Sequence, residues 1–465
     1  MKNRLRTLII LGLILIFAGI LRIHTFYIPH SHGDQVYYIG LAMKLEREGL
    51  KGYNLRSINT GLIEKDGSIV AVIPSKDNRK GRLLEGLEKS NVLYYSKESI
   101  SNMPPAYSFL LMLSHKIFKA DGLYTLVNLP RGAGAKIMRA DKRAAIFSGQ
   151  FYSVWISFIF SLTLIAVTFL LGRSLFNKNV GLIAAFLLAI APVDILTSQR
   201  IWADDMAALF QALTILFFWL GEKRGKTYFT VFSGIAAGIA CLTKGSGLFI
   251  VAIITIFFIL KGKKGTVPFF INKNLFSIKK GNRPLFQRIL FFYIACIAVC
   301  GFWYIKIATV YGTPFYTPKQ EGIEYASSWF MMLANRPFYG QFIYFVYLSP
   351  ILALFYWEAV YTFIKRVFTD ERLLVLLWAF FYLAVLALVG GKEERYMLPA
   401  YPAICIFSAL TLENVRLKIN SSNNLKALGI VIVALVLILC AVWSIKLGLS
   451  CVLNDGAIFM CLNEI

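Results

Sequence analysis

Charged residues are scarce in this chain, and acidic ones are scarcer still. Of 465 residues only 16% are charged, with 25 Asp and Glu against 49 Lys and Arg, whereas 57% are hydrophobic. Together with a mean hydropathy of +0.63, this composition excludes an ordinary soluble globular domain. The basic surplus does not indicate nucleic-acid binding, because many of the Lys and Arg residues lie in short loops between apolar segments.

Side chains that bind metals are also few. The chain has 4 His, none in a metal-like spacing, and its 7 Cys include no CxxC pair, so the sequence indicates no zinc site. We predict that the protein requires no cofactor. The sequence does not decide whether it binds a divalent cation. Two cysteines in the C-terminal tail, Cys451 and Cys461, could pair only in an oxidising compartment. The other five lie in apolar segments and are expected to be small core hydrophobes: Cys241, Cys296, Cys300, Cys405 and Cys440.

Long apolar stretches recur from one end of the chain to the other. Many have the roughly 17 to 25 residues that a helix needs to span hydrocarbon, and a backbone in lipid must satisfy its own hydrogen bonds, which favours helices. We therefore predict an all-α polytopic membrane protein with about 11 transmembrane helices. The predicted spans are 8–27, 144–171, 180–198, 205–221, 228–244, 247–261, 288–307, 342–364, 371–389, 397–412 and 425–445.

The positions of the basic residues predict the orientation. Lys2, Arg4 and Arg6 precede the first apolar run, which has no small-residue cleavage site after it, so we expect an uncleaved span with a cytoplasmic N-terminus. The short loops that become cytoplasmic hold more Lys and Arg than the opposite turns, and the loop from Lys261 to Arg288 holds eight. This asymmetry is what the positive-inside rule expects.

A long polar loop, residues 28–143, follows the first span on the extracytoplasmic side. Two amphipathic stretches within it, 34–48 and 104–118, are expected to form helices that lie along the membrane interface. A short strand is expected within Gly67–Pro74.

This threading brings scattered polar residues to one outer face. They are Asp34, Asp204, Asp205, Lys244, Glu393, Glu394, Arg395 and Tyr396. Taken singly, each has an ordinary explanation, because an acid can cap a helix, a lysine can snorkel and charges are common at span ends. Two adjacent acids nevertheless exceed the needs of one cap, and the glycines after Lys244 allow a ligand to approach the backbone. A shared face predicts a shared site.

Several of these segments resemble, in their order and sidedness, the GT-C membrane glycosyltransferases. They are Asp34, Pro104-Pro105-Ala106-Tyr107, Asp204, Leu242-Thr243-Lys244-Gly245, Arg336-Pro337-Phe338-Tyr339 and Arg395-Tyr396-Met397-Leu398-Pro399-Ala400-Tyr401-Pro402. The resemblance covers most of the chain from Asp34 to about Pro402. It is to the branch of protein O-mannosyltransferases, lipid A aminoarabinose transferases and core-lipopolysaccharide uronosyltransferases. The chain departs from the pattern at Gln35, often Glu, and at Asn102-Met103, where His often precedes the prolines.

The resemblance implies an enzyme of the cell (inner) membrane that moves a sugar from a polyprenyl-phosphate donor to an extracytoplasmic acceptor, which could be an envelope glycan such as lipopolysaccharide, a lipid or a protein. Residues 1–412 would form the transmembrane catalytic module, and 413–465 a loop, the last transmembrane helix and a short extracytoplasmic tail. The implied residues are Asp34, Asp204 and Asp205 for catalysis, Lys244, Arg395 and Tyr396 for the donor phosphate, and Pro104, Pro105, Tyr107, Glu394 and Tyr339 for substrate contacts. A carboxylate suits activation of a hydroxyl, and cations suit a leaving phosphate.

Two other function classes also fit an apolar chain. A transporter or flippase of lipid-linked glycans would place ionisable residues near the membrane midplane, and the sequence shows Asp194 close to the outer end of the third span but no evident inverted repeat. A non-catalytic scaffold would not need Asp34, Lys244 and Arg395 to converge. The geometry of these side chains separates the hypotheses.

Overall fold

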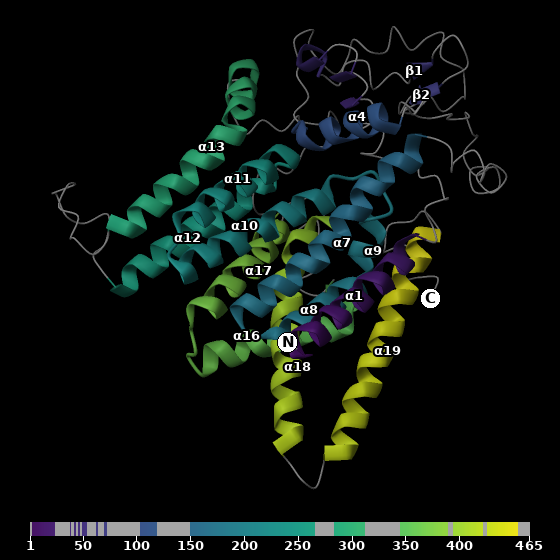
Figure 1. The fold of residues 1–465 in the computed structure, drawn as a ribbon, viewed down its shortest axis with the longest axis vertical. Helices are drawn as coiled ribbons and strands as arrows, with labels where there is room; N and C mark the ends of the chain where they lie inside the picture. The colour runs from purple at the N-terminus through teal and green to yellow at the C-terminus, as the bar shows by residue number, and fades with distance from the viewer. Residues whose placement is uncertain are drawn as a thin grey trace.

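The protein is a helical bundle in the computed structural model (Figure 1). The structure describes residues 2–23, 38, 41–42, 45–46, 49–53, 62–63, 69–71, 103–118, 149–265, 283–311, 345–388, 394–421 and 426–453.

Every predicted span overlaps one helix or a few consecutive helical segments among the described residues. The first six spans correspond to α1 (Lys2–Ile23), α7 (Gly149–Leu175), α8 (Lys178–Ala189) with α9 (Pro192–Thr197), α10 (Asp204–Arg224), α11 (Thr227–Thr243) and α12 (Gly247–Gly265). The remaining five correspond to α13 (Arg283–Tyr311), η2 (Pro350–Ala353) with α16 (Leu354–Ile364), α17 (Asp370–Leu388), η3 (Glu394–Ala400) with α18 (Tyr401–Ser421), and α19 (Lys426–Leu453).

Length and composition support membrane crossing. Five of the described helices are long and apolar enough to cross a membrane, and five further described helices are apolar but shorter. The chain is a multi-pass membrane protein with an all-α spanning region. The number of eleven crossings stays a prediction.

Proline explains why some predicted spans are broken. The third span divides into α8 and α9, because Pro192 has no backbone N–H to continue a helix and instead occupies the first turn of the next one. Pro350 likewise opens η2 ahead of α16. The tenth span begins as the 3-10 segment η3, which contains Pro399, and α18 then continues to Ser421, past the predicted end at 412.

The described parts of the first loop agree with the predicted elements. Helix α4 (Ala106–Phe118) confirms the helix expected over 104–118. Strand β1 (Leu62–Ile63) pairs antiparallel with β2 (Ile69–Ala71), which lies in the segment expected to contain a strand. Within 34–48, the described residues 38, 41–42 and 45–46 are helical, and Tyr38, Leu41, Ala42 and Leu45 are buried.

Helices α11 and α13 approach each other closely because α11 presents glycine to its neighbour. A Cβ added at Gly234 would lie 2.3 Å from the Phe292 carbonyl oxygen, and one at Gly238 would lie 2.6 Å from Val299 Cβ. Small residues at such an interface let two backbones come together, which is a common means of helix association in membranes.

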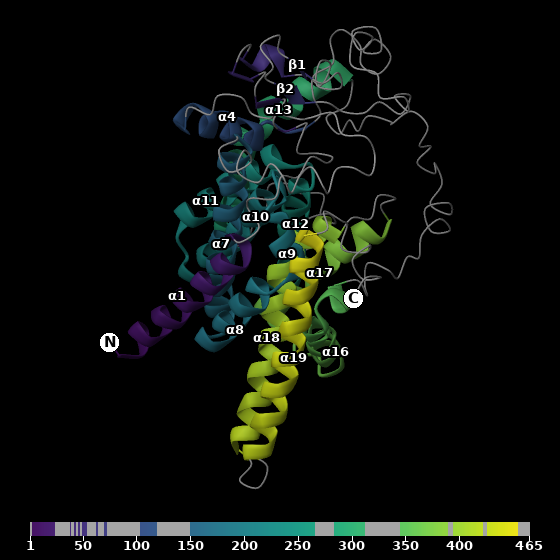
Figure 2. The same cartoon turned by 90° about the vertical axis from the view of Figure 1, so that its right-hand side faces the viewer.

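Alternation of helix direction gathers several loop-end residues at one end of the bundle. Asp204 opens α10, Lys244 directly follows α11, and Arg395 lies in η3 before α18. Figures 1 and 2 show α4, β1 and β2 at the top of the molecule, whereas the end of α18 and the start of α19 extend at the bottom.

Candidate functional site

Asp204 lies between two predicted phosphate-binding cations. The Lys244 Nζ atom is 2.6 Å from Asp204 Oδ1, and Arg395 Nη1 is 3.8 Å from Asp204 Oδ2. The Asp204 and Arg395 side chains are only 3% and 7% exposed, so little solvent screens these charges. Three residues that are up to 191 positions apart in the sequence therefore meet in one place.

Aromatic rings complete this cation–carboxylate cluster. The Arg395 guanidinium lies 4.2 Å from the centre of the Trp202 ring and 5.3 Å from that of Tyr396, and Lys244 Nζ lies 4.6 Å from the Tyr396 ring. Cations at these distances are attracted to ring faces. The predicted grouping of Lys244, Arg395 and Tyr396 is therefore observed as a geometric fact.

Arg200 is a third cation of the cluster, and the sequence-based site did not include it. Its guanidinium lies 4.8 Å from the Trp202 ring, and its side chain is 5% exposed. Trp202 therefore contacts both Arg200 and Arg395. The available signal was the position of Arg200 four residues before Asp204 in the same outer turn.

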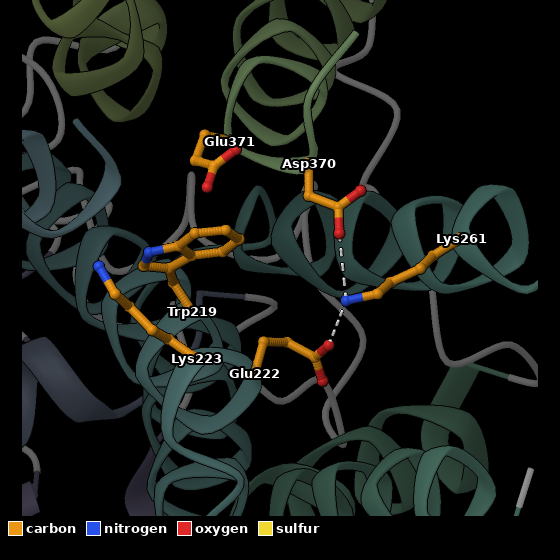
Figure 3. A pocket seen from close by; sticks show the side chains of 6 residues that line it. All are labelled: Trp219, Glu222, Lys223, Lys261, Asp370 and Glu371. Atoms are coloured by element: carbon orange, nitrogen blue, oxygen red, sulfur yellow. Dashed lines mark hydrogen bonds and ion pairs between the residues drawn. The ribbon is translucent and has the colours of Figure 1, made fainter. Parts of the chain in front are cut away.

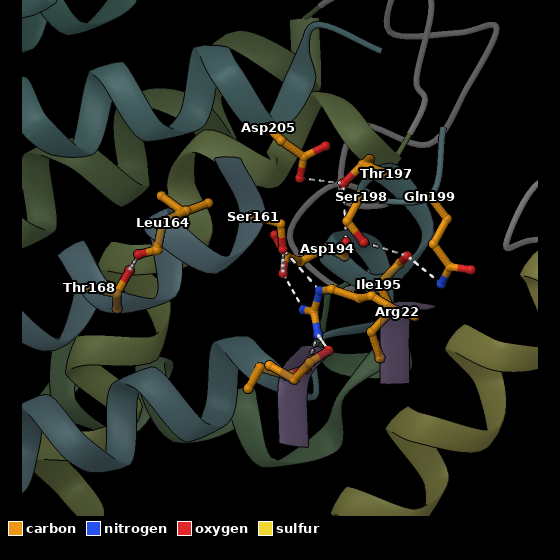
Figure 4. A network of polar contacts seen from close by, with 12 residues as sticks. Arg22, Ser161, Leu164, Thr168, Asp194, Ile195, Thr197, Ser198, Gln199 and Asp205 are labelled. Carbon is orange, nitrogen blue, oxygen red and sulfur yellow. Dashed lines mark hydrogen bonds and ion pairs between the residues drawn. The ribbon is translucent and has the colours of Figure 1, made fainter. Parts of the chain in front are cut away.

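Asp205 has different surroundings from Asp204. Its Oδ1 atom accepts a 3.0 Å hydrogen bond from the Thr197 hydroxyl, and its Oδ2 atom has no hydrogen-bond partner among the described residues. Figure 4 shows this carboxylate bonded to Thr197 of α9. Neither acid caps α10, whose N-cap position is held by Ala203 without a side-chain hydrogen bond. Side-chain capping by the acidic pair is therefore not observed, although both acids lie in the first turn of α10, where the helix dipole favours negative charge.

A buried ion pair lies next to Asp205. Arg22 of α1 pairs with Asp194 of α9, and Ser161 joins them by accepting from Arg22 Nε at 2.9 Å and donating to Asp194 Oδ2 at 2.8 Å (Figure 4). Both charged side chains are fully buried. Sequence reasoning noticed Asp194 but not its partner. The pairing could have been predicted from an Arg and an Asp in separate apolar spans, because charges inside a membrane bundle usually pair with one another.

Helix α4 is linked by hydrogen bonds to the turn that contains Trp202. The Tyr107 hydroxyl lies 2.8 Å from Ser157 Oγ, and Ser157 donates to the Trp202 carbonyl oxygen at 3.3 Å. The Tyr107 ring also packs at 5.0 Å against Tyr38. Burial raises the pKa of Tyr107 well above its ordinary value, so its hydroxyl stays protonated.

The other predicted substrate contacts are only partly described. Pro104 and Pro105 are buried before α4, and the Pro104 carbonyl oxygen accepts a 3.2 Å hydrogen bond from Tyr53. Glu394 is half-buried at the start of η3. Asp34, Glu393 and Tyr339 lie outside the described residues, so the catalytic role of Asp34 and the substrate contact of Tyr339 stay predictions.

A pocket of about 250 Å³ lies far from Asp204 along α10. It is lined by Trp219, Glu222, Lys223, Lys261, Asp370 and Glu371 (Figure 3). Lys261 Nζ bridges Glu222 at 2.5 Å and Asp370 at 3.3 Å. Trp219 follows Asp204 by 15 residues, which is about 22 Å of helix. This pocket is therefore separate from the cation–carboxylate cluster, and its charges join the ends of α10, α12 and α17.

Comparison with known proteins agrees with the resemblance seen in the motifs. Residues 144–271 match the family described as dolichyl-phosphate-mannose-protein mannosyltransferase. No curated protein matches the sequence.

Solved structures match over nearly the whole chain. The apo oligosaccharyltransferase of Archaeoglobus fulgidus superposes with a TM-score of 0.55 at 17% identity over 97% of this chain. ArnT from Cupriavidus metallidurans superposes in its apo state with a TM-score of 0.54 at 13% identity, over 99% of this chain and 74% of that one. ArnT bound to undecaprenyl phosphate gives 0.52 at 13% identity, over 98% of this chain and 73% of that one.

These matches define the class of the fold. The chain has the fold of the GT-C membrane glycosyltransferases, and the predicted all-α polytopic architecture is confirmed. The chain spans 56% of the length of the archaeal oligosaccharyltransferase.

Proposed function

We propose that this protein is a membrane glycosyltransferase that moves a sugar from a polyprenyl-phosphate donor to the hydroxyl of an extracytoplasmic acceptor. The observation that carries the proposal is the convergence of Lys244 and Arg395 on Asp204, beside Trp202 and Tyr396. A scaffold without a reaction has no need of this arrangement. The acceptor is an envelope glycan, a lipid or a protein.

The charge of the cluster suits a phosphate. Three cationic side chains gather here, with Lys244 and Arg395 beside Asp204 and Arg200 beside the Trp202 ring. Lysine and arginine are the usual partners of phosphate oxygens. We assign Asp204 a positioning role, because a carboxylate between two cations holds them close together before the donor binds.

Known lipid phosphates in similar folds support this donor class. One structure of AglB from Archaeoglobus fulgidus, 16% identical over 96% of this chain with a TM-score of 0.54, contains a dolichol-phosphate and an inhibitory peptide. The ArnT structure described above contains undecaprenyl phosphate. Both lipids present the phosphate that the cation cluster suits.

The transfer step is a single displacement. The acceptor oxygen attacks the anomeric carbon while Asp34 takes the hydroxyl proton, and the bond from the anomeric carbon to the phosphate oxygen breaks. The bonding electrons remain on the phosphate, whose growing charge Lys244 and Arg395 stabilise. Attack from the face opposite the phosphate inverts the anomeric centre, as in inverting glycosidases. Asp34 precedes Tyr38 by four residues, and the Tyr38 ring packs against Tyr107, which is linked through Ser157 to the Trp202 carbonyl oxygen.

The direct test is a transfer assay with a panel of polyprenyl-phosphate sugars. Wild-type protein should transfer one donor sugar with inversion, and Asp34→Asn should lower turnover by about 10² to 10⁴, the usual contribution of a general base. The protein should be assayed in detergent or vesicles with candidate glycan, lipid and peptide acceptors.

A matched control separates loss of the base from loss of the fold. Asp370→Asn changes an acid at the pocket of Figure 3, far from the cluster, and should leave turnover near wild type. Full activity of Asp34→Asn would remove the proposed base. Absence of transfer from every donor, combined with movement of a lipid-linked glycan across vesicles, would favour a flippase.

A further inference from the structure

Three cysteines from two helices form a compact thiol cluster. The Sγ atoms of Cys241 on α11 and of Cys296 and Cys300 on α13 all lie within 4.8 Å of one another. All three side chains are buried and none forms a disulfide. Among the described residues, these three cysteines form the group of His, Cys, Asp or Glu side chains that are close enough together to hold a metal ion, and neither Asp204 nor Asp205 belongs to it.

The helix geometry holds the thiols in place before any ligand arrives. Cys296 and Cys300 are four residues apart, so they lie on one face of α13. Gly238 of α11 lets the two backbones approach, since a Cβ there would lie 2.8 Å from the Cys296 carbonyl oxygen. The Tyr304 hydroxyl donates to the Cys241 carbonyl oxygen at 3.2 Å and joins the same helices one turn further along α13.

We propose that Cys241, Cys296 and Cys300 form a binding site for one soft, thiophilic metal ion of the Cu(I) type. Sulfur ligands select soft ions, whereas harder ions prefer oxygen. Three sulfurs at about 2.3 Å from one ion in a trigonal plane are about 4 Å apart, so small rotations of the thiols complete the site.

The apolar surroundings favour a monovalent ion. Burial of a net charge away from water is costly, and a thiol that becomes a thiolate ligand releases a proton. One Cu⁺ that replaces one thiol proton leaves the net charge of the cluster unchanged. The other two sulfurs then coordinate as thiols or release further protons, and a count of the protons released on binding reports which.

The chain offers a matched control. Cys405 of α18 is as deeply buried as Cys241 but does not belong to the cluster. Serine at Cys405 therefore changes a buried thiol without changing the site.

The test is an anaerobic titration of the reduced, full-length protein in detergent with Cu(I) against a chromophoric Cu(I) chelator. Wild type and Cys405→Ser should each withdraw one more equivalent of Cu(I) than a variant with serine at all three positions. Each single serine variant of the cluster should weaken that equivalent at least about tenfold, because it removes one sulfur ligand. Equal stoichiometry in wild type and the triple variant would overturn the proposal.

X-ray absorption of the loaded wild type gives a second answer that needs no variant. Three sulfur neighbours per copper at about 2.3 Å are expected, and a first shell of nitrogen or oxygen would overturn the proposal even if the triple variant does not fold. Both readouts measure metal binding alone, so they stand or fall independently of the transfer reaction.

Discussion

At the residue scale, Asp204 and Asp205 are neighbours whose side chains have different partners. Asp204 meets Lys244 and Arg395, whereas Asp205 accepts from Thr197 beside the buried Arg22–Asp194 pair. Adjacent positions at the start of a helix point about 100° apart around its axis. Asp204 can therefore contact Lys244 and Arg395 while Asp205 contacts Thr197 of α9.

The first prediction separates these two acids. Asp204→Asn should lower transfer at least about tenfold, because Lys244 and Arg395 lose the charge that holds them together. Asp205→Asn keeps an oxygen that can accept from Thr197 and should stay within about threefold of wild type, since it loses no described partner. Turnover and thermal unfolding of both variants in detergent are the measurements. Equal losses of turnover at matched stability would contradict the assignment.

The second prediction concerns Lys244. Lys244→Met keeps the apolar stem but removes a charged donor worth about 1.5 to 3 kcal/mol, so KM for the lipid-phosphate donor should rise about 10- to 100-fold. The acceptor KM should change little. Lys223→Met is the control, because Lys223 lies at the other end of α10, where it donates to the Ser174 carbonyl oxygen. An unchanged donor KM in Lys244→Met would show that this lysine does not bind the phosphate.

At the element scale, α4 is the part of the first loop that holds the Trp202 turn. It contacts α7 through Tyr107 and, two turns further on, through His115, whose Nε2 lies 2.8 Å from Ser153 Oγ. Burial lowers the pKa of His115 to about 4, since a charged imidazole would lose its hydration there. Burial of this contact between α4 and α7 therefore favours the neutral form of His115.

The third prediction is a pH dependence of stability. Between pH 6.5 and 4 an unfolded His115 binds a proton that the folded one does not, so stability rises with pH in this window and falls on acidification. The shift corresponds to about 3 kcal/mol. Thermal unfolding of wild type and His115→Gln at pH 7 and pH 4.5 is the measurement. The variant should lose less stability on acidification, and equal losses would show that His115 is not the titrating group.

At the scale of the whole molecule, helix direction decides which residues meet. Helix α11 ends beside Lys244, and its other end begins after Lys226, near the charges that line the pocket of Figure 3. The two charged regions therefore occupy opposite ends of the bundle. In a membrane they would face opposite compartments.

The fourth prediction is a topology. With the tail cysteines replaced by serine, Gly245→Cys should react with a membrane-impermeant maleimide from the extracytoplasmic side, and Lys226→Cys from the cytoplasmic side. Both positions are exposed, and a Cβ at Gly245 meets no atom within 4 Å. Asp34→Cys should label from the same side as Gly245→Cys. Labelling of Asp34→Cys from the cytoplasmic side would show that Asp34 does not share a site with Lys244 and Arg395.

Much of the architecture follows from local properties of the chain. The length of each apolar run predicts a spanning helix, and the distribution of Lys and Arg predicts its direction, which is why every predicted span has helical residues. The same threading predicted that Asp204, Lys244 and Arg395 share a face, and the structure brings them together. The breaks before Pro192 and Pro350 are also local, since proline cannot continue a helix.

Side-chain pairing was decided only by the tertiary structure. Hydropathy and charge report how long a helix is and which way it runs, but not how far it rotates or slides against a neighbour. That rotation turns Asp204 rather than Asp205 toward the cations, sets Arg22 against Asp194 across 172 positions, and brings Cys241 to the thiols of α13. Each of these contacts depends on packing between segments far apart in the chain, and no single segment carries that information.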